Sequence, residues 1–139
     1  MIIFQSEGVE LPNLDIAKVS RWLNEVASDY DRLIGDLVYL FCNDEIILST
    51  NRQFLNHDYY TDIITFDNTI GKKVSADIYI SLETVASNAK DLNVNYDDEL
   101  RRVIVHGLLH LCGIKDKSPE ERAEMESAEN AALAKYNEI

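Results

Sequence analysis

The sequence lacks three features that would each define a class of protein. It has only 2 cysteines, Cys42 and Cys112, and neither lies in a CxxC pair, so a disulfide framework is excluded. It has no run of about 18 apolar residues, so no membrane span is expected. The first residues, MIIFQSEGVELPN, contain no basic stretch before an apolar segment, and we expect no signal peptide. These absences favour a protein of the reducing cytoplasm.

Positive charge is also scarce. The chain has 13 Lys and Arg against 25 Asp and Glu, which gives a formal net charge of −12. Proteins that bind nucleic acids or anionic membranes by bulk electrostatics tend to be basic. The composition therefore argues against a general polyanion binder and against a membrane partner, and contact with RNA would require a local basic patch.

The length and hydrophobic content of the chain are sufficient for one packed domain. The chain has 139 residues, of which 46% are hydrophobic, and we find no repeat, low-complexity segment or linker. We predict a single domain over residues 1–139 of the α+β class, in which a small, mostly antiparallel or mixed sheet of about four strands packs with about five helices. Periodicity and turn signals predict strands at 2–5, 36–42, 61–66 and 76–81, and helices at about 14–30, 43–55, 82–91, 97–112 and 118 onward.

Local signals set several of these boundaries. Asn43 can cap the second helix, whose Ile47, Phe54 and Leu55 we expect to face the core. Ser118, followed by proline and, three residues on, by glutamate, forms a capping box for the last helix. The acidic segment EERAEMESAEN within that helix predicts a solvated face, with Met125 near the buried side.

The segment HGLLHLCGIKD, residues 106–116, indicates a metal site. Histidines four apart on a helix lie on one face, with Cβ atoms about 6 Å apart, as in the HExxH zinc motif. A bare pair is weak evidence, but Gly113 can end the helix with a left-handed residue and return Asp116 toward His106 and His110. Two nitrogens and one carboxylate oxygen would leave a fourth position open, as in catalytic zinc sites. The alternative for Asp116 is an ordinary exposed loop acid.

Two families share this spacing. The metzincin proteases use HExxHxxGxxH, but their general-base glutamate corresponds here to Gly107, which has no side chain to move a proton. The sequence more closely resembles the YbeY-type endoribonucleases, whose pattern is HGxLHLxGYDH. Residues 106–113 match its fixed positions, NRQFLNHDYYTDIITF at 51–66 is similar to N-x-x-Y-R-x-x-D-x-P-T-D-V-L-S-F, and ADIYIS at 76–81 is similar to G-D-I-x-I-S.

The resemblance implies a metal-dependent, single-strand-specific endoribonuclease that acts in 16S rRNA 3′-end maturation and ribosome quality control. It implies one Zn²⁺ per chain held by His106, His110 and Asp116, ribosomal RNA and small-subunit proteins as partners, no DNA, and a cleft lined by Thr61 and Asp62. We expect catalysis to rest on metal-activated water, and no side chain is an obvious general base. A non-catalytic ribosome assembly factor, in which the metal only ties loop to helix, remains an alternative; a metallopeptidase is a third.

Three departures from the family pattern matter. Asp116 replaces the third histidine, and its harder, charged oxygen could shift metal preference toward Mn²⁺ or Mg²⁺. The family's arginine corresponds to Leu55, and we hypothesise that Arg102, one turn before His106, supplies the missing phosphate contact. The alternative for Arg102 is a surface residue in an i,i+4 ladder. Tyr60 replaces a proline, and we expect His57 to be a surface residue rather than a fourth ligand.

Further basic residues could complete a positive groove on the acidic body. If several share one cleft, RNA affinity should fall with salt according to the phosphates contacted. The candidates are Arg52, Lys72, Lys73, Arg101, Arg102, Lys115 and Lys117.

Overall fold

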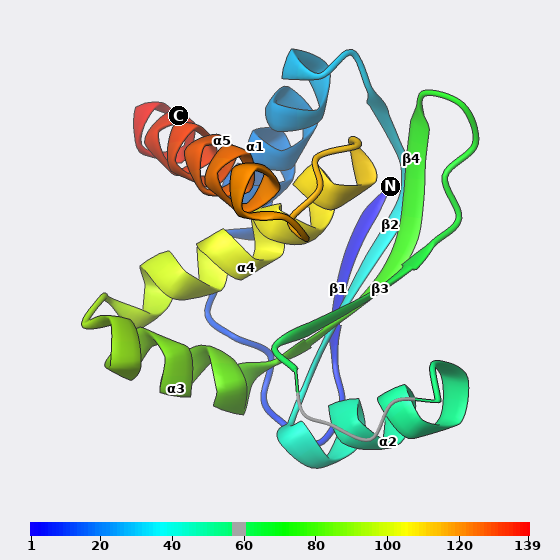
Figure 1. Cartoon of the computed structure of the whole chain (residues 1–139), viewed down its shortest axis with the longest axis vertical. Helices are drawn as coiled ribbons and strands as arrows, with labels where there is room; N and C mark the ends of the chain where they lie inside the picture. Colours follow the sequence, from blue (N-terminus) through cyan, green and yellow to red (C-terminus); the bar gives the residue numbers. More distant parts are fainter. Residues whose placement is uncertain (57–60) are drawn as a thin grey trace.

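The computed structural model describes residues 1–56 and 61–139, and in this part of the chain one four-stranded sheet is covered by helices (Figure 1). The strands are β1 (Ile2–Ser6), β2 (Leu33–Cys42), β3 (Ile63–Asp67) and β4 (Lys73–Ser81). The helices are α1 (Ile16–Asp29), α2 (Asp44–Phe54), α3 (Leu82–Leu92), α4 (Tyr96–Leu111) and α5 (Pro119–Glu138). The α+β class is confirmed, with element order as expected.

The sheet is mixed. Its strand order is β1-β2-β4-β3; β1 and β4 pair with β2 in parallel, and only β3 and β4 are antiparallel. Of the two sheet types expected, the mixed one is therefore present, with parallel pairs in the majority. Parallel neighbours need crossover connections, which α1 provides between β1 and β2. The antiparallel β3–β4 pair instead turns tightly at Gly71, whose φ is +59°.

One face of the sheet carries the main core. Alternate residues of β2 and β4, including Tyr39 and Ile78, are fully buried against the helices α1, α3, α4 and α5. A smaller cluster of Cys42, Ile47 and Ile64 lies under α2 on the other face. The expectation for the end of α2 was wrong: Phe54 is 61% exposed and Leu55 is 38% exposed. The ring of Phe54 lies edge-on against that of Phe66.

Helix α4 lies unusually close to the sheet, and this places its histidines. A Cβ added at Gly107 would meet the Cδ1 atoms of Ile63 and Ile78 at 3.1 and 3.2 Å, closer than ordinary contact. The buried hydroxyl of Tyr39 donates a hydrogen bond of 2.8 Å to the carbonyl of Ile104 and so ties α4 to β2. Helix α5 packs against the side of α4 that points away from the sheet.

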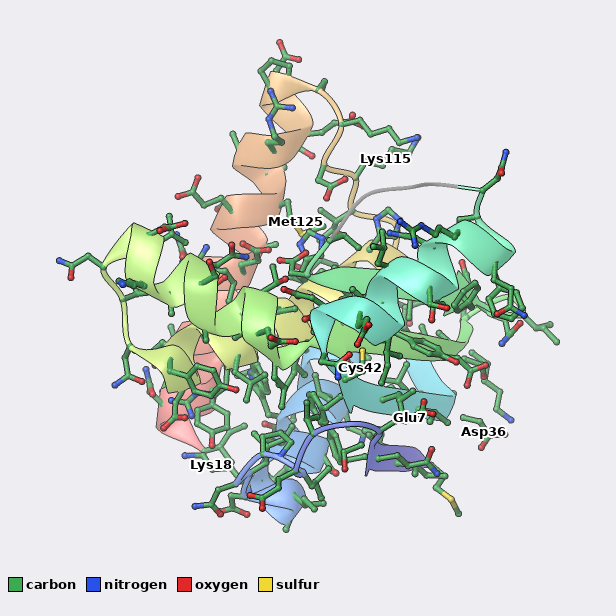
Figure 2. The ribbon with its side chains drawn as sticks, turned by 90° about the horizontal axis from the view of Figure 1, so that it is seen from below. Glu7, Lys18, Asp36, Cys42, Lys115 and Met125 are labelled. Atoms are coloured by element: carbon green, nitrogen blue, oxygen red, sulfur yellow. The ribbon has the colours of Figure 1, made fainter. Side chains whose placement is uncertain are left out.

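Helix α5 is fixed over α1 and α4 by its apolar stripe. The indole nitrogen of Trp22 in α1 donates to the carbonyl of Ala132 at 2.7 Å, and Met125 is buried in the main core. At its start, the predicted capping box is confirmed, with reciprocal bonds between Ser118 and Glu121. Figure 2 shows Met125 within the body of the molecule, whereas Lys115 extends from the loop that precedes α5.

Side chains that end in nitrogen or oxygen extend outward from many parts of the molecule (Figure 2). A search of the described residues finds no helix with the length and apolar character needed to cross a membrane.

Candidate metal-binding active site

A pocket of about 370 Å³ lies where α4, the start of β3 and the loop before α5 meet. It brings together the three predicted metal ligands with the two residues expected in the cleft. Its lining consists of Thr61, Asp62, Ile63, Thr65, His106, His110, Asp116 and Lys117. Residues from three separate segments of the sequence thus share one pocket.

The turn that returns Asp116 to this pocket is built by the end of α4. Gly113 has a φ of +101°, and its N–H donates to the carbonyl of His110 at 3.1 Å. The N–H of Ile114 donates to the carbonyl of Leu109 at 3.1 Å, which completes a Schellman motif. As predicted, the helix therefore stops at a left-handed glycine, and the Asp116 carboxylate reaches 3.3 Å from Nε2 of His106.

The donor types fit a divalent transition metal. Zinc accepts both imidazole nitrogens and carboxylate oxygens as ligands. Their arrangement is only partly convergent: His106 and Asp116 approach each other, whereas His110 is exposed on the rim. Within residues 1–56 and 61–139, no group of three His, Cys, Asp or Glu side chains has donors gathered around one point. The ligand set therefore remains a prediction that chemistry and pocket support.

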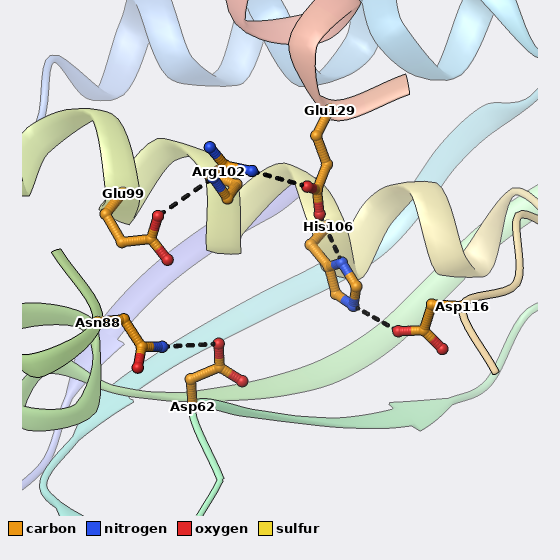
Figure 3. A network of polar contacts seen from close by, with 7 residues as sticks. All are labelled: Asp62, Asn88, Glu99, Arg102, His106, Asp116 and Glu129. Atoms are coloured by element: carbon orange, nitrogen blue, oxygen red, sulfur yellow. Dashed lines mark hydrogen bonds and ion pairs between the residues drawn. The ribbon is translucent and has the colours of Figure 1, made fainter. Parts of the chain in front are cut away.

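The inner side of His106 has a partner that the sequence did not reveal. Nδ1 of its ring lies 2.8 Å from an oxygen of Glu129, which belongs to α5 and is almost completely buried. The other oxygen of Glu129 accepts from Arg102 at 3.2 Å, and Arg102 forms an ion pair of 3.1 Å with Glu99 (Figure 3). His106 is thus held between a buried network and an open loop.

The prediction that the acidic residues of this segment form a solvated face of α5 is therefore wrong for Glu129. A signal for its burial does exist, because Met125, Glu129, Ala132 and Tyr136 recur at helical spacing and all four are buried. An acid within such a stripe needs a buried partner. In the folded structure these partners are His106 and Arg102, both from α4.

Burial and local charges together shift the pKa values of two groups in the pocket. Burial lowers the pKa of His106, but the hydrogen bond and charge of Glu129, with the charges of Asp116 and Asp62, outweigh it, so the net pKa is raised. Burial raises the pKa of Asp62, only partly offset by the charge of His106 and by backbone hydrogen bonds. Asp62 also accepts from Asn88 of α3 at 3.4 Å. Of the two carboxylates in this pocket, Asp62 lies directly before β3, whereas Asp116 lies in the loop before α5 (Figure 3).

The basic residues do not gather in one groove around the pocket. Arg102 is not an ordinary surface arginine, because Glu99 and Glu129 both pair with it. Its contact with phosphate stays a prediction. Arg101 pairs with Asp98 and lies over the Tyr136 ring, and Lys72 pairs with Asp31 at the far end of β4. Of the seven candidates, Lys117 lines the pocket.

Positions 57–60 lie outside the described residues, so the expectations for His57 and Tyr60 are untested.

A second pocket of about 380 Å³ adjoins the first and shares His106 and Asp116 with it. Arg122, which was not among the seven basic candidates, lines this pocket and donates to the carbonyl of Lys117 at 2.9 Å. Lys117 thus lines the first pocket, whereas the second is lined by Arg122 and by Arg102, which is paired with Glu99 and Glu129.

Comparison with known proteins agrees with the resemblance. The family model described as Endoribonuclease YbeY matches residues 2–137. Proteins named "Endoribonuclease YbeY" from Bacteroides thetaiotaomicron and Phocaeicola vulgatus are 53% and 54% identical, and each alignment covers 96% of this chain and 97% of the relative. A solution structure of a Thermotoga maritima protein superposes with a TM-score of 0.68 at 25% identity, over 98% of this chain and 89% of the other. The chain therefore belongs to the Endoribonuclease YbeY family.

Proposed function

We propose that this protein is a metal-dependent endoribonuclease that cuts single-stranded RNA, with the 3′ end of 16S rRNA as its substrate. The observation that carries the proposal is the pocket that unites His106, His110 and Asp116 with Asp62 and Lys117. The family membership supports the ribonuclease activity, since the relatives are named endoribonucleases. The role in ribosome quality control and the small-subunit protein partners follow from the same resemblance, and we place the activity in the bacterial cytoplasm.

Each residue of the pocket has a role in this proposal. His106, His110 and Asp116 would hold one Zn²⁺, or Mn²⁺ or Mg²⁺ because Asp116 is a harder ligand. A bound ion supplies Lewis-acid polarisation of the phosphate and acidifies water. Lys117 lies in the pocket and can contact a phosphate oxygen of the RNA.

Asp62 is the proton acceptor in this proposal. It lines the pocket and is not one of the three predicted ligands. Its burial raises its pKa, which makes the carboxylate more basic than an exposed one. A carboxylate of this kind can take the proton from the attacking hydroxyl, whether that group belongs to water or to the RNA 2′ position.

The structure weakens the two alternative functions. A metal that only ties loop to helix is not needed, because the Schellman motif holds one end of the loop and the Ser118 capping box the other. A peptidase general base next to His106 would have to replace Gly107, where an added Cβ atom would crowd Ile63 and Ile78. A carboxylate at that position would point into the sheet rather than into the pocket.

The test is cleavage of an rRNA 3′-end fragment by metal-loaded protein, with His110→Ala purified in parallel. His110 is the suitable variant because it is exposed, so its replacement should leave the fold intact. We expect cleavage by the wild type and none by the variant, and weaker binding at higher salt. Equal cleavage by both would indicate a contaminating nuclease, and no cleavage by either would contradict the nuclease function of the isolated chain.

A further inference from the structure

Glu129 is a buried acid whose two oxygens have different partners. It lies in the middle of the apolar stripe of α5, and its side chain is 9% exposed. One oxygen accepts from Nη1 of Arg102 at 3.2 Å, and the other lies 2.8 Å from Nδ1 of His106. Burying a carboxylate is costly unless it is paired and hydrogen-bonded, and both conditions are met here.

Arg102 supplies the positive charge beside this carboxylate. A guanidinium is always charged in proteins, and this one lies between Glu129 and Glu99, which is also buried. An ionised carboxylate can only accept hydrogen bonds. The 2.8 Å contact therefore requires a hydrogen on Nδ1 of His106.

A hydrogen on Nδ1 decides what the other ring nitrogen can do. In neutral imidazole only one nitrogen carries hydrogen, so Nε2 then presents a lone pair. Nε2 is the atom that faces Asp116 and the pocket, at 3.3 Å from the carboxylate. Figure 3 shows the whole series, with Glu129 on one side of the ring and Asp116 on the other.

We propose that Glu129 is a positioning residue that holds His106 with its hydrogen on Nδ1, so that Nε2 is directed at the pocket as a metal ligand. Arg102 and Glu99 in turn hold Glu129. The metal part of this inference rests on the proposed function, whereas the tautomer of His106 does not. Outer partners of this kind orient histidine ligands and increase their basicity, and losing one typically weakens metal affinity about 10- to 100-fold.

Two variants separate the charge of Glu129 from its capacity to accept a hydrogen bond. E129M has similar length but no acceptor, and E129Q keeps an acceptor oxygen without the charge. E124Q is the matched control, because Glu124 is an exposed acid of the same helix. Nitrogen NMR of the full chain without metal, at a pH where the ring is neutral, reports which nitrogen of His106 carries the hydrogen.

We expect the Nδ1–H form in the wild type and in E124Q, a mixture in E129Q, and mainly the Nε2–H form in E129M, as in free histidine. Zn²⁺ affinity, measured by competition with a chelator, should fall by about 10- to 100-fold in E129M and less in E129Q. Neither measurement involves RNA cleavage, so failure of the nuclease proposal would leave both results unaffected.

An unchanged tautomer together with an unchanged Zn²⁺ affinity in E129M would overturn the inference. If E129M does not fold, E129Q decides by the same two measurements, since its amide has almost the same shape as the carboxylate. A wild-type ring with its hydrogen on Nε2 would overturn the inference on its own, whatever the affinities. A wild-type chain that binds no Zn²⁺ would overturn the metal part.

Discussion

The two nitrogens of the His106 ring face two very different regions of the molecule. Nδ1 faces a buried network in which helices α4 and α5 supply Glu99, Arg102 and Glu129. Nε2 faces Asp116 on a loop, in a pocket whose rim carries the exposed His110. Rigid elements thus fix the ring from one side and leave the other side accessible, which is the arrangement that a ligand-binding site requires.

The buried region should dominate stability. Arg102→Met would leave two buried carboxylates without their cation, and we expect a loss of about 3–5 kcal/mol in the free energy of unfolding. On the open side, Asp116→Asn should change it by no more than about 0.5 kcal/mol. Urea denaturation of both metal-free variants measures the difference. Similar losses in the two would contradict the expectation that the buried region contributes more stability than the open one.

The loss in Arg102→Met should also depend on pH. Burial raises the pKa of Glu99 although Arg102 counteracts it. A carboxyl whose pKa is raised in the folded state stabilises the fold fully below its unfolded pKa and loses that contribution as pH rises through its folded pKa. Without Arg102 the shift grows, so the variant should be closest to wild type in acid and furthest from it at neutral pH.

A variant of Asp62 tests whether residues of the open pocket take part in catalysis. Asp62→Asn should lower the rate of RNA cleavage by about 100-fold or more, the usual effect of losing a general base. Its folded-state pKa is raised by burial, so the ionised carboxylate destabilises the fold as pH rises through that pKa. We therefore expect the variant to be as stable as wild type at neutral pH, or more stable. If Asp62→Asn lost stability but kept full activity, Asp62 would have a structural role and not a catalytic one.

Replacing Asp116 should change the metal preference of the open pocket. Asp116→His restores the third imidazole of the family pattern and should favour Zn²⁺ over Mn²⁺ by about 10-fold more than the wild type does, because imidazole is the softer ligand. Competition binding with both metals checks this. An unchanged ratio would show that Asp116 does not contact the metal.

The smallest effect is expected at the start of α5. Ser118→Ala removes the acceptor of the capping box and should cost about 1 kcal/mol of stability. Because Glu129 lies about three turns further along the helix, Zn²⁺ affinity should stay within about twofold of wild type. A larger change in affinity would mean that the network responds to fraying of the helix end.

Local signals predicted the elements and much of the pocket. The capping residues Asn43 and Ser118 and the stop at Gly113 each depend on a few neighbouring residues, and all three were confirmed. The expected strand at 36–42 was too short, because β2 begins at Leu33 through pairing with Lys73 across an irregular register. Such pairing depends on a partner far along the chain, which no local pattern reports.

The same limit explains the residues that were missed. Glu129 is buried because α5 docks on α1 and α4, and Trp22 and Ala132 make that contact across 110 positions of sequence. Phe54 looked like a core residue by spacing, but it is largely exposed at the end of α2. Helical periodicity therefore shows which residues share a face, whereas the neighbours of that face come only from the tertiary structure.

The position of Glu129 in α5 also sets an order of events during synthesis. Both histidines lie in α4 and leave the ribosome before α5 does. Until α5 has been made and has docked, Nδ1 of His106 lacks the carboxylate that directs the opposite nitrogen at the pocket. A nascent chain therefore carries all of its predicted ligands before it has the carboxylate that positions one of them, and α5 supplies that carboxylate.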